Sequence, residues 1–450
     1  MSGQVFAAVD IGASSGRVIA GTVDDDRITL DVVHRFAHAA GAIDGSLRWN
    51  LSEVFRHVEL GLSRIPAATS IGIDTWGVDY GLLDDNGRLL AEPISYRDDR
   101  TAKYVNDVHA IASPAELFAV NGLQFLPFTT IYQLAAERRG PRWADAAHAV
   151  LLPDLLAYWL TGELRTEVTN ASTTGLLDAR TRTWATGLLD RLGYPQDLFP
   201  PLEAPGAVRG RTPAGIPVVT VGSHDTASAV VGVPATTANF AYISCGTWSL
   251  VGVELDRPVL TDAARAANFT NEAGVDGRTR FLRNVGGLWL LQECLREWQR
   301  SDLDSLLVAA ARLPPGGPLV DVDDPAFIPP GAMPRRIVSA AGGALDDVAI
   351  VRCVLDSLAA AFARTVHQAA ELAGQPIEVV HLVGGGAQNE LLCRLTAAAI
   401  RLPVVAGPVE ATALGNIAVQ AWTAGALPAS LEATRARIAG CTSLRRFDPT

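Results

Sequence analysis

The chain opens on a strand, a turn of small residues and a second strand, and its middle repeats that pattern. The first copy is VFAAVDIGASSGRVIAGTV from residue 5, and the second is FAYISCGTWSLVGVEL over 240–255. Apolar runs separated by a Gly- and Ser-containing turn are typical of hairpins. Two such openings in 450 residues indicate an internal duplication and two α/β domains. The apolar fraction of 48% is sufficient for two cores.

Strand and helix signals alternate along the rest of the chain. The segment GVPATTAN at 232–239 is small, polar and contains Pro, which suits a connection between domains. We therefore expect an N-terminal domain over 1–233 and a C-terminal domain over 238–450. RLPVVAGP and ATALGNIAVQAWTAG are expected to be the last strand and the last helix. Apolar spacing or composition predicts earlier helices over 51–64, 150–161, 285–300 and 348–373.

Composition excludes several classes of protein. The net charge of -11 argues against a protein that coats nucleic acid or an anionic membrane. The five cysteines contain no C-x-x-C pair, so a zinc site or a disulfide framework is not expected. No apolar run has a membrane-spanning length, and the N-terminus lacks the basic region of a signal peptide, so we expect a cytoplasmic protein. Lys103 is the only lysine and stands outside any Walker A pattern, which excludes a P-loop.

The first turn has the residues that a phosphate-binding loop requires. Gly12 and Gly16 are expected to adopt positive φ and to let the backbone approach an anion. Ser14 and Ser15 add hydroxyl donors, and Arg17 adds a permanent, forked positive charge. An ordinary Gly/Ser hairpin is the alternative interpretation.

Two further positions fit this nucleotide hypothesis. Asp10 ends the first strand, where its carboxylate could hold the waters of a magnesium ion. Thr247 supplies the hydroxyl of the second turn, so the two turns together could bind one triphosphate.

The run Ser223-His224-Asp225 invites comparison with a hydrolase triad, but consecutive side chains cannot converge on one point. Asp225 is a better candidate for the base that accepts a proton from a hydroxyl during phosphoryl transfer. The alternative is that Asp225 caps the Ala-rich helix behind it, and both roles are compatible.

Glycines 384–386 follow a predicted strand at 378–383 and precede a helix from about Gln388. Asn389 occupies the place of the third glycine in a dinucleotide fingerprint, which disfavours a dehydrogenase. A turn that packs against adenine or ribose fits better.

The whole chain resembles the FGGY carbohydrate kinases, from near residue 5 to near residue 420. The strings that carry the resemblance include VDIGASSGR, SIGIDTWGVDYGLLD, SHDTASAV, CGTWSL, LWLLQE, VGGGAQN and GPVEATALGN. IDTWGVDYGLLD and QFLPFTTIYQL are similar to the branch of the family that phosphorylates L-rhamnulose. The resemblance implies two ribonuclease H-like domains of the actin, hexokinase and Hsp70 superfold, with a central interdomain cleft. The N-terminal domain would bind the sugar and carry the first phosphate loop, and the C-terminal domain would bind the nucleotide.

The resemblance also implies roles for individual residues. Asp225 would be the proton acceptor, and Asp10 would lie near Mg²⁺. The expected sugar contacts are Gly77, His224, Asp225, Thr226 and Asn284. The expected ATP contacts are Ala13, Ser14, Ser15, Gly16, Arg17, Thr247, Gln292 and Gly385.

The expected reaction converts ATP and L-rhamnulose to ADP and L-rhamnulose 1-phosphate, as a step of L-rhamnose catabolism. Two alternatives stay open: a kinase for another ketose or polyol such as xylulose, fuculose or glycerol, and an ATP-driven switch of the same superfold. Cys245 departs from the family pattern, because a serine is expected beside the second phosphate loop. The sequence leaves open whether the chain acts as a monomer or a homo-oligomer.

Overall fold

The computed structural model describes residues 3–25 and 27–449, which form two compact units. Unit 1 takes in the chain up to Thr236 together with Glu254–Phe281 and Ala411–Cys441, and the other residues form unit 2. The first crossing between the units lies within the connection at 232–239. The division into 1–233 and 238–450 stays a prediction. Two segments that follow residue 238, Glu254–Phe281 and Ala411–Cys441, belong to unit 1.

Unit 1 is built on a mixed sheet with the strand order β11-β12-β6-β1-β2-β3. β1, β2 and β3 are antiparallel neighbours, β6 runs parallel to β1 and β12 runs parallel to β6. The strands of this sheet are β1 (Gln4–Ile11), β2 (Ser15–Val23), β3 (Ile28–Ala37), β6 (Ile71–Thr75), β11 (Val208–Arg211) and β12 (Pro217–Val219).

Helices and further short strands complete unit 1. The short strands are β4 (Gly41–Ile43), β5 (Ser46–Arg48), β7 (Tyr80–Leu83), β8 (His148–Leu151), β9 (Thr166–Glu167), β10 (Leu202–Glu203) and β15 (Thr270–Ala273). The helices are α1 (Leu51–Leu62), α2 (Val105–Ile111), α3 (Pro114–Asn121), α4 (Thr130–Glu137), α5 (Leu152–Thr161), α6 (Val168–Ala171), α7 (Thr186–Leu192), α8 (Asp225–Val231), α9 (Asp262–Ala266), α15 (Ala411–Thr423) and α16 (Leu431–Cys441).

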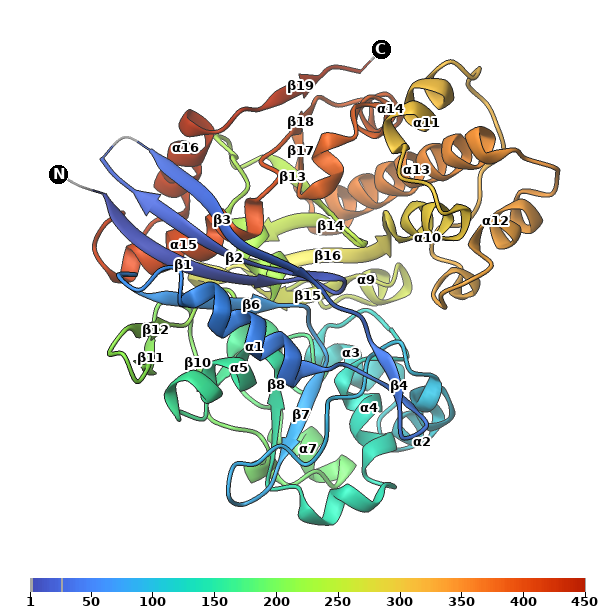
Figure 1. Cartoon of the computed structure of the whole chain (residues 1–450). Coiled ribbons are helices and arrows are strands. Elements are labelled where there is room, and N and C mark those ends of the chain that lie inside the picture. The colour runs from blue at the N-terminus through green and yellow to red at the C-terminus, as the bar shows by residue number, and fades with distance from the viewer. Residues whose placement is uncertain (1–2, 26, 450) are drawn as a thin grey trace. The chain divides into compact units, whose positions relative to one another are not determined.

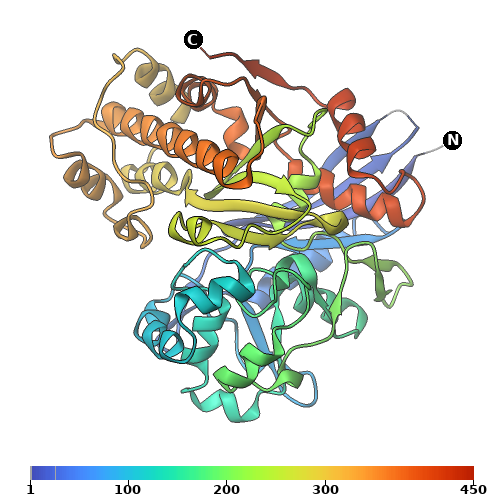
Figure 2. The same ribbon diagram turned by 180° about the vertical axis from the view of Figure 1, so that it is seen from behind.

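The late helices of the chain belong to the first sheet. Figures 1 and 2 show α15 and α16, in red, beside the blue strands β1 to β3. Leu414 and Ile417 of α15 share a buried cluster with Phe6 and Ile19 of the hairpin. Burial of these side chains explains why a segment some 400 residues away in sequence completes unit 1.

Unit 2 contains the strand run β14-β13-β17-β18-β19 of the second sheet. Its elements are β13 (Phe240–Cys245), β14 (Trp248–Leu255), β16 (Thr279–Gly286), β17 (Val379–Val383), β18 (Val404–Ala406), β19 (Arg445–Phe447), α10 (Trp289–Trp298), α11 (Leu303–Ala311), α12 (Met333–Ala341), α13 (Asp347–Ala373) and α14 (Glu390–Ile400), and the ends of β14 and β16 extend into unit 1. The orange helix α13 packs against α11 and α14 (Figure 2).

The predicted duplication is present in the strand directions. Along β2-β1-β6-β12-β11 the neighbours are antiparallel, parallel, parallel and antiparallel. Along β14-β13-β17-β18-β19 the same four relations recur. Each unit therefore contains a hairpin that begins a mixed sheet, and the strand directions are the same in the two sheets.

Some predicted boundaries are wrong. Residues 150–161 do not form one helix, because β8 continues to Leu151 and α5 begins at Leu152, with Pro153 in its first turn. β18 and α15 are followed by α16 and β19, so they are not the last elements. α14 begins at Glu390, after a 3-10 turn at Gly385–Gln388. Within residues 3–25 and 27–449, no helix combines the length and the apolar character needed to cross a bilayer.

Candidate active site

The first turn joins β1 to β2, and an ion pair closes it at its base. Asp10 and Arg17 face each other in the antiparallel register, with Arg17 Nη2 2.6 Å from Asp10 Oδ2. Asp10 is buried, whereas the Arg17 side chain is 21% exposed. The pair fixes the guanidinium beside the turn for which the sequence predicts phosphate contacts.

The tip of this turn is accessible, but its glycines act differently from the prediction. Residues 13–15 are exposed or half-buried, and Gly12 N donates to Ser15 O at 3.0 Å. Neither Gly12 nor Gly16 has a positive φ, so that expectation is wrong. Gly16 instead lies against the ring of Phe36, where a Cβ would come within 2.2 Å of a ring carbon. Close packing inside the hairpin is what requires glycine at position 16.

A second carboxylate lies beside Asp10, and the sequence analysis missed it. Asp74 is the penultimate residue of β6 and pairs with Asp10 in the parallel register. Its side chain is fully buried, and Asn416 Nδ2 donates to Asp74 Oδ2 at 2.6 Å. Burial, reinforced by the charges of Asp10 and Asp225, raises the pKa of Asp74 well above its ordinary value. An acidic residue near the end of an apolar strand, which Asp10 also is, was the signal that could have found it.

Asp225 begins helix α8 and is more exposed than the other two carboxylates. Its Oδ1 accepts hydrogen bonds from Thr226 N at 2.6 Å and from Thr226 Oγ1 at 3.1 Å. The N-cap residue of α8 is His224, whose side chain makes no capping hydrogen bond. Asp225 is the first residue of the helix, and its carboxylate accepts from a backbone N–H of the first turn. The Asp225 side chain is 28% exposed, which a proton acceptor for a bound substrate requires.

β6 brings the remaining sugar-site candidates of unit 1 close to Asp225. Thr75 N donates to Ser223 O at 2.9 Å, and Thr75 forms an isolated bridge with His224. Gly77 follows β6 and lies against Thr173, whose Oγ1 would be 2.8 Å from a Cβ at position 77. The predicted residues Gly77, His224, Asp225 and Thr226 therefore share one region of unit 1.

Val78, which follows Gly77, has a left-handed backbone conformation that is uncommon for a β-branched residue. Its φ is 67°. Thr173 Oγ1 accepts from Val78 N at 3.1 Å, and Thr130 Oγ1 donates to Val78 O at 2.6 Å. The next residue, Asp79, is buried and accepts from Trp49 Nε1 at 2.6 Å. These bonds hold the turn in a conformation that the sequence alone would not predict.

In unit 2, the second turn lies against the start of α10. Leu288 N donates to Gly246 O at 2.9 Å, and Trp289 N donates to Thr247 O at 3.1 Å. Gln292 lies in the first turn of α10 and is exposed. The structure therefore brings together Thr247 and Gln292, two of the predicted ATP contacts.

The glycine turn after β17 borders the same end of β13. Gly384 has a φ of 82°, and a Cβ at Gly386 would lie 2.3 Å from Cys245 Sγ, so both glycines are needed for the fold. Gly385 is exposed, and a Cβ there would meet nothing within 4 Å. The space beside Gly385 fits the predicted approach of a nucleotide. Asn284, the predicted sugar contact of unit 2, is half-buried on β16.

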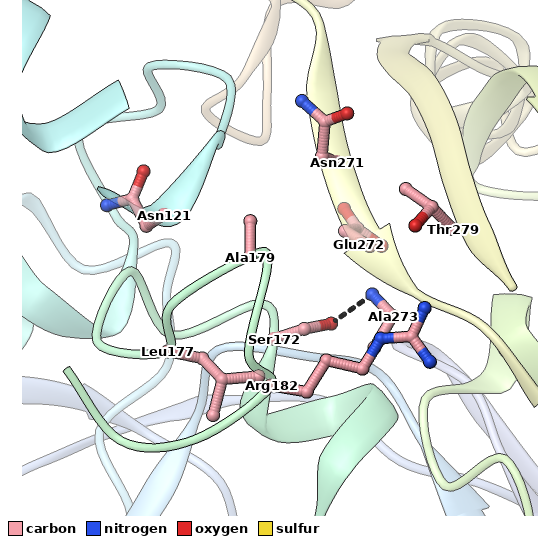
Figure 3. Close-up of a pocket in the computed structure, with 9 residues that line it drawn as sticks. All are labelled: Asn121, Ser172, Leu177, Ala179, Arg182, Asn271, Glu272, Ala273 and Thr279. Atoms are coloured by element: carbon pink, nitrogen blue, oxygen red, sulfur yellow. Dashed lines mark hydrogen bonds between the residues drawn. The ribbon is translucent and has the colours of Figure 1, made fainter. Parts of the chain in front are cut away.

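One enclosed cavity in unit 1 is too small for a sugar or a nucleotide. Its volume of about 10 Å³ suits a single water molecule. It is lined by Asn121, Ser172, Leu177, Ala179, Arg182, Asn271, Glu272, Ala273 and Thr279 (Figure 3). The cavity belongs to the supporting structure behind His224, because Glu272 contacts that histidine.

The residues of this site could supply only part of the coordination of a magnesium ion, and the rest would come from phosphates and waters. Among residues 3–25 and 27–449, no three His, Cys, Asp or Glu side chains cluster to hold a metal. Magnesium in kinases commonly takes one or two carboxylates and completes its coordination with phosphates and waters. The Asp10 carboxylate at the base of the first turn is of the type that such a site needs.

Two long stretches of the chain match one family of known proteins. Residues 5–232 match the FGGY family of carbohydrate kinases, N-terminal domain, and residues 241–424 match the C-terminal domain of that family. The chain is 43% identical to a rhamnulokinase of Klebsiella pneumoniae subsp. pneumoniae, over 100% of this chain and 95% of the relative. A rhamnulokinase of Klebsiella pneumoniae strain 342 is 42% identical with the same coverage.

Solved structures share the fold at low identity. Gluconate kinase from Lactobacillus acidophilus superposes with a TM-score of 0.78 at 15% identity, over 100% of this chain and 94% of that one. Plasmodium falciparum glycerol kinase with ADP also gives 0.78, at 18% identity and the same coverage. These neighbours confirm the predicted actin- and hexokinase-like fold class. The two domain matches, which together span most of the sequence, establish that the chain belongs to the FGGY family of carbohydrate kinases.

Proposed function

We propose that this carbohydrate kinase transfers the γ-phosphoryl group of ATP to L-rhamnulose, giving ADP and L-rhamnulose 1-phosphate. The observation that supports L-rhamnulose as the substrate is the 43% identity with a rhamnulokinase over the whole chain. We further propose that the reaction occurs in the cytoplasm as a step of L-rhamnose catabolism.

Asp225 is the proposed general base. Its carboxylate accepts the proton of the sugar hydroxyl while that oxygen attacks the γ-phosphorus, and the bond from the γ-phosphorus to the leaving oxygen of ADP breaks. The 28% exposure of Asp225 supports this role, because Asp10 and Asp74 are buried. Gly77, His224 and Thr226 of unit 1 are the proposed sugar contacts near the base, and Asn284 of unit 2 is a further one.

The proposed ATP contacts divide between the two hairpin turns and the glycine turn. In unit 1, residues 13–17 offer backbone and hydroxyl donors and the Arg17 charge to phosphate oxygens. In unit 2, Thr247, Gln292 and Gly385 are the proposed contacts, and each is exposed or half-buried. Mg²⁺ would neutralise phosphate charge during transfer, and Asp10 would hold it through coordinated water.

Substrate choice is tested by ADP release in a coupled assay with L-rhamnulose, L-fuculose, L-xylulose, D-xylulose and glycerol. We expect the highest kcat/KM with L-rhamnulose, and a product in which phosphorus-31 NMR places the phosphate on C1. A higher kcat/KM for another acceptor would overturn the assignment of L-rhamnulose as the substrate but would still support a sugar kinase. ATP hydrolysis that no sugar stimulates would instead favour the ATP-driven switch.

A further inference from the structure

A fully buried arginine lies behind the proposed sugar site, and the proposed reaction does not use it. The Arg280 side chain on β16 is 0% exposed. A buried guanidinium is tolerated only with close partners of suitable charge and geometry. The partners of Arg280 are Glu272, the backbone of Ala273 and the imidazole of His224, all within unit 1.

Glu272 balances the charge of this arginine. Its Oε2 lies 3.0 Å from Arg280 Nη1, and Arg280 Nε donates to Ala273 O at 3.1 Å. Burial alone would raise the pKa of Glu272, but the charge of Arg280 and the contact with His224 hold the pKa below its ordinary value. Glu272 is therefore a carboxylate, and the ion pair is neutral as a whole.

The strand that carries Glu272 is anchored from the other side of the small cavity. Ser172 Oγ accepts a hydrogen bond from Ala273 N at 2.9 Å, drawn as the dashed line in Figure 3. Together with the Arg280 bond to Ala273 O, both polar groups of the Ala273 backbone are engaged. The ion pair thus has a fixed position relative to α6 and His224.

The contact between Arg280 and His224 defines which imidazole nitrogen carries the proton. Arg280 Nη2 lies 3.2 Å from His224 Nδ1 in hydrogen-bonding geometry. A guanidinium can only donate, so Nδ1 must accept, and the proton of a neutral imidazole is then on Nε2. Glu272 Oε2 is 3.3 Å from Nδ1 but makes no hydrogen bond of suitable angle.

The protonated nitrogen faces the proposed base. His224 Nε2 lies 3.4 Å from Asp225 Oδ1, an electrostatic contact without a hydrogen bond of suitable angle, and Oδ1 accepts hydrogen bonds from Thr226 N and Thr226 Oγ1. All three of these neighbours are on Oδ1. The carboxylate is thereby turned so that Oδ2 is the oxygen left for the proton of the substrate hydroxyl.

We propose that Arg280 and Glu272 are positioning residues that hold His224 as the Nε2–H tautomer and, through it, orient the Asp225 carboxylate with Oδ2 toward the sugar. This proposal rests on the proposed function for its kinetic consequence. Its structural part, the tautomer of His224, concerns the protein alone and needs no substrate.

Two variants separate this role from ordinary burial of an ion pair. Arg280→Lys keeps the charge that balances Glu272 but replaces the planar fork with a point charge, which cannot hold Glu272 and Nδ1 together in the same way. Arg209→Lys is the matched control, because Arg209 is also buried and pairs with Asp154 at 2.7 Å and Glu203 at 3.0 Å, without contacting His224.

The tautomer is read by nitrogen-15 NMR of the full-length protein labelled at histidine, with His224→Gln identifying the signals of residue 224. We expect wild type and Arg209→Lys to show a protonated Nε2 and an unprotonated Nδ1. Arg280→Lys is expected to show a mixture of tautomers. A wild-type protein with its proton on Nδ1 overturns the proposal, even if Arg280→Lys does not fold.

Kinetics provide the second measurement. Arg280→Lys should lower kcat at least tenfold and raise KM for the sugar, with KM for ATP unchanged. Arg209→Lys should change the melting temperature at most, with both KM values and kcat retained. An Arg280→Lys enzyme with wild-type kinetics and an unchanged His224 spectrum overturns the proposal. If wild type itself shows no sugar-dependent ADP release, the proposed function fails, and the tautomer result still decides the structural part.

Discussion

At the scale of single residues, three carboxylates of unit 1 differ in solvent exposure, and therefore in whether they can reach a substrate. Asp10 is buried against Arg17, and Asp74 is buried against Asn416. Asp225 alone among them has 28% of its side chain exposed. A base must reach its substrate, so this difference in exposure supports the proposal that Asp225, and not Asp10 or Asp74, accepts the proton.

Val78 is the residue for which backbone strain makes a prediction. A β-branched side chain at a φ of 67° stores about 1–3 kcal/mol, and the bonds from Thr173 and Thr130 maintain it. In Val78→Gly, relief of strain should offset the greater entropy of the unfolded chain, so the free energy of unfolding should change by less than about 1 kcal/mol. The looser turn should raise KM for the sugar about fivefold, equal to about 1 kcal/mol, without changing KM for ATP.

Arg401→Gly is the control for Val78→Gly. Arg401 has a φ of 61°, is exposed and is the C-cap residue that follows α14 in unit 2. Its replacement should leave all kinetic constants unchanged. If Val78→Gly behaves like Arg401→Gly in steady-state assays, the strained turn does not position the sugar.

Cys245 is one position where this sequence departs from the family pattern. Its thiol is buried against Gly386, and burial raises its pKa to about 11. We expect iodoacetamide at pH 8 to modify the half-buried Cys441 first and to leave Cys245 intact, whereas all five cysteines should react after denaturation. Peptide mass spectrometry reads the sites. Rapid modification of Cys245 in the folded protein would mean that its side chain is accessible to solvent and not buried against Gly386.

At the scale of secondary-structure elements, a buried polar chain ties helix α15 to the first sheet. Ser70 Oγ donates to Gln420 Oε1 at 2.7 Å, Gln420 Nε2 donates to Asn416 Oδ1 at 2.7 Å, and Asn416 donates to Asp74. Gln420 Nε2 also donates to Ala7 O at 3.1 Å. Asn416 and Gln420 are four residues apart, so one face of α15 makes all of these bonds.

This network predicts the cost of breaking it. Asn416→Ala leaves Asp74 Oδ2 without its donor in a buried site, which should lower the free energy of unfolding by about 1–3 kcal/mol. Urea unfolding measures the change. Thr412→Ala on the same helix is the control, because Thr412 is half-buried and lies outside the network. Equal stabilities for the two variants would show that the polar chain does not hold α15.

Local patterns predicted the two hairpins and several of the helices, and the failures have physical causes. The opening hairpin and the 348–373 helix follow from strand and helix periodicity, and α13 spans Asp347–Ala373. Residues 150–161 read as one apolar helix because β8 is buried and its sequence carries no alternation. The support behind His224 was not predictable, since Glu272 and Arg280 reach it only through tertiary packing of β15 and β16.

At the scale of the whole molecule, the same strand arrangement occurs in both units, and two later segments of the chain belong to unit 1. The same order of antiparallel and parallel strands occurs in both sheets, as the repeated hairpin predicts. Glu254–Phe281 and Ala411–Cys441 nevertheless belong to unit 1. A linear cut in the sequence cannot anticipate this, because hydropathy shows that a segment is buried and not which core it enters.

In the proposed reaction, the chain transfers a phosphoryl group from ATP to a sugar hydroxyl, and Asp225 accepts the proton of that hydroxyl. The most direct measurement is sugar-dependent ADP release by Asp225→Asn, together with the melting temperature and the calorimetric affinity for L-rhamnulose. Asn retains the oxygen that accepts from Thr226 N, so we expect a folded protein that binds the sugar, with kcat lowered by about 10²–10⁴-fold. An Asp225→Asn enzyme with wild-type kcat would show that Asp225 is not the base.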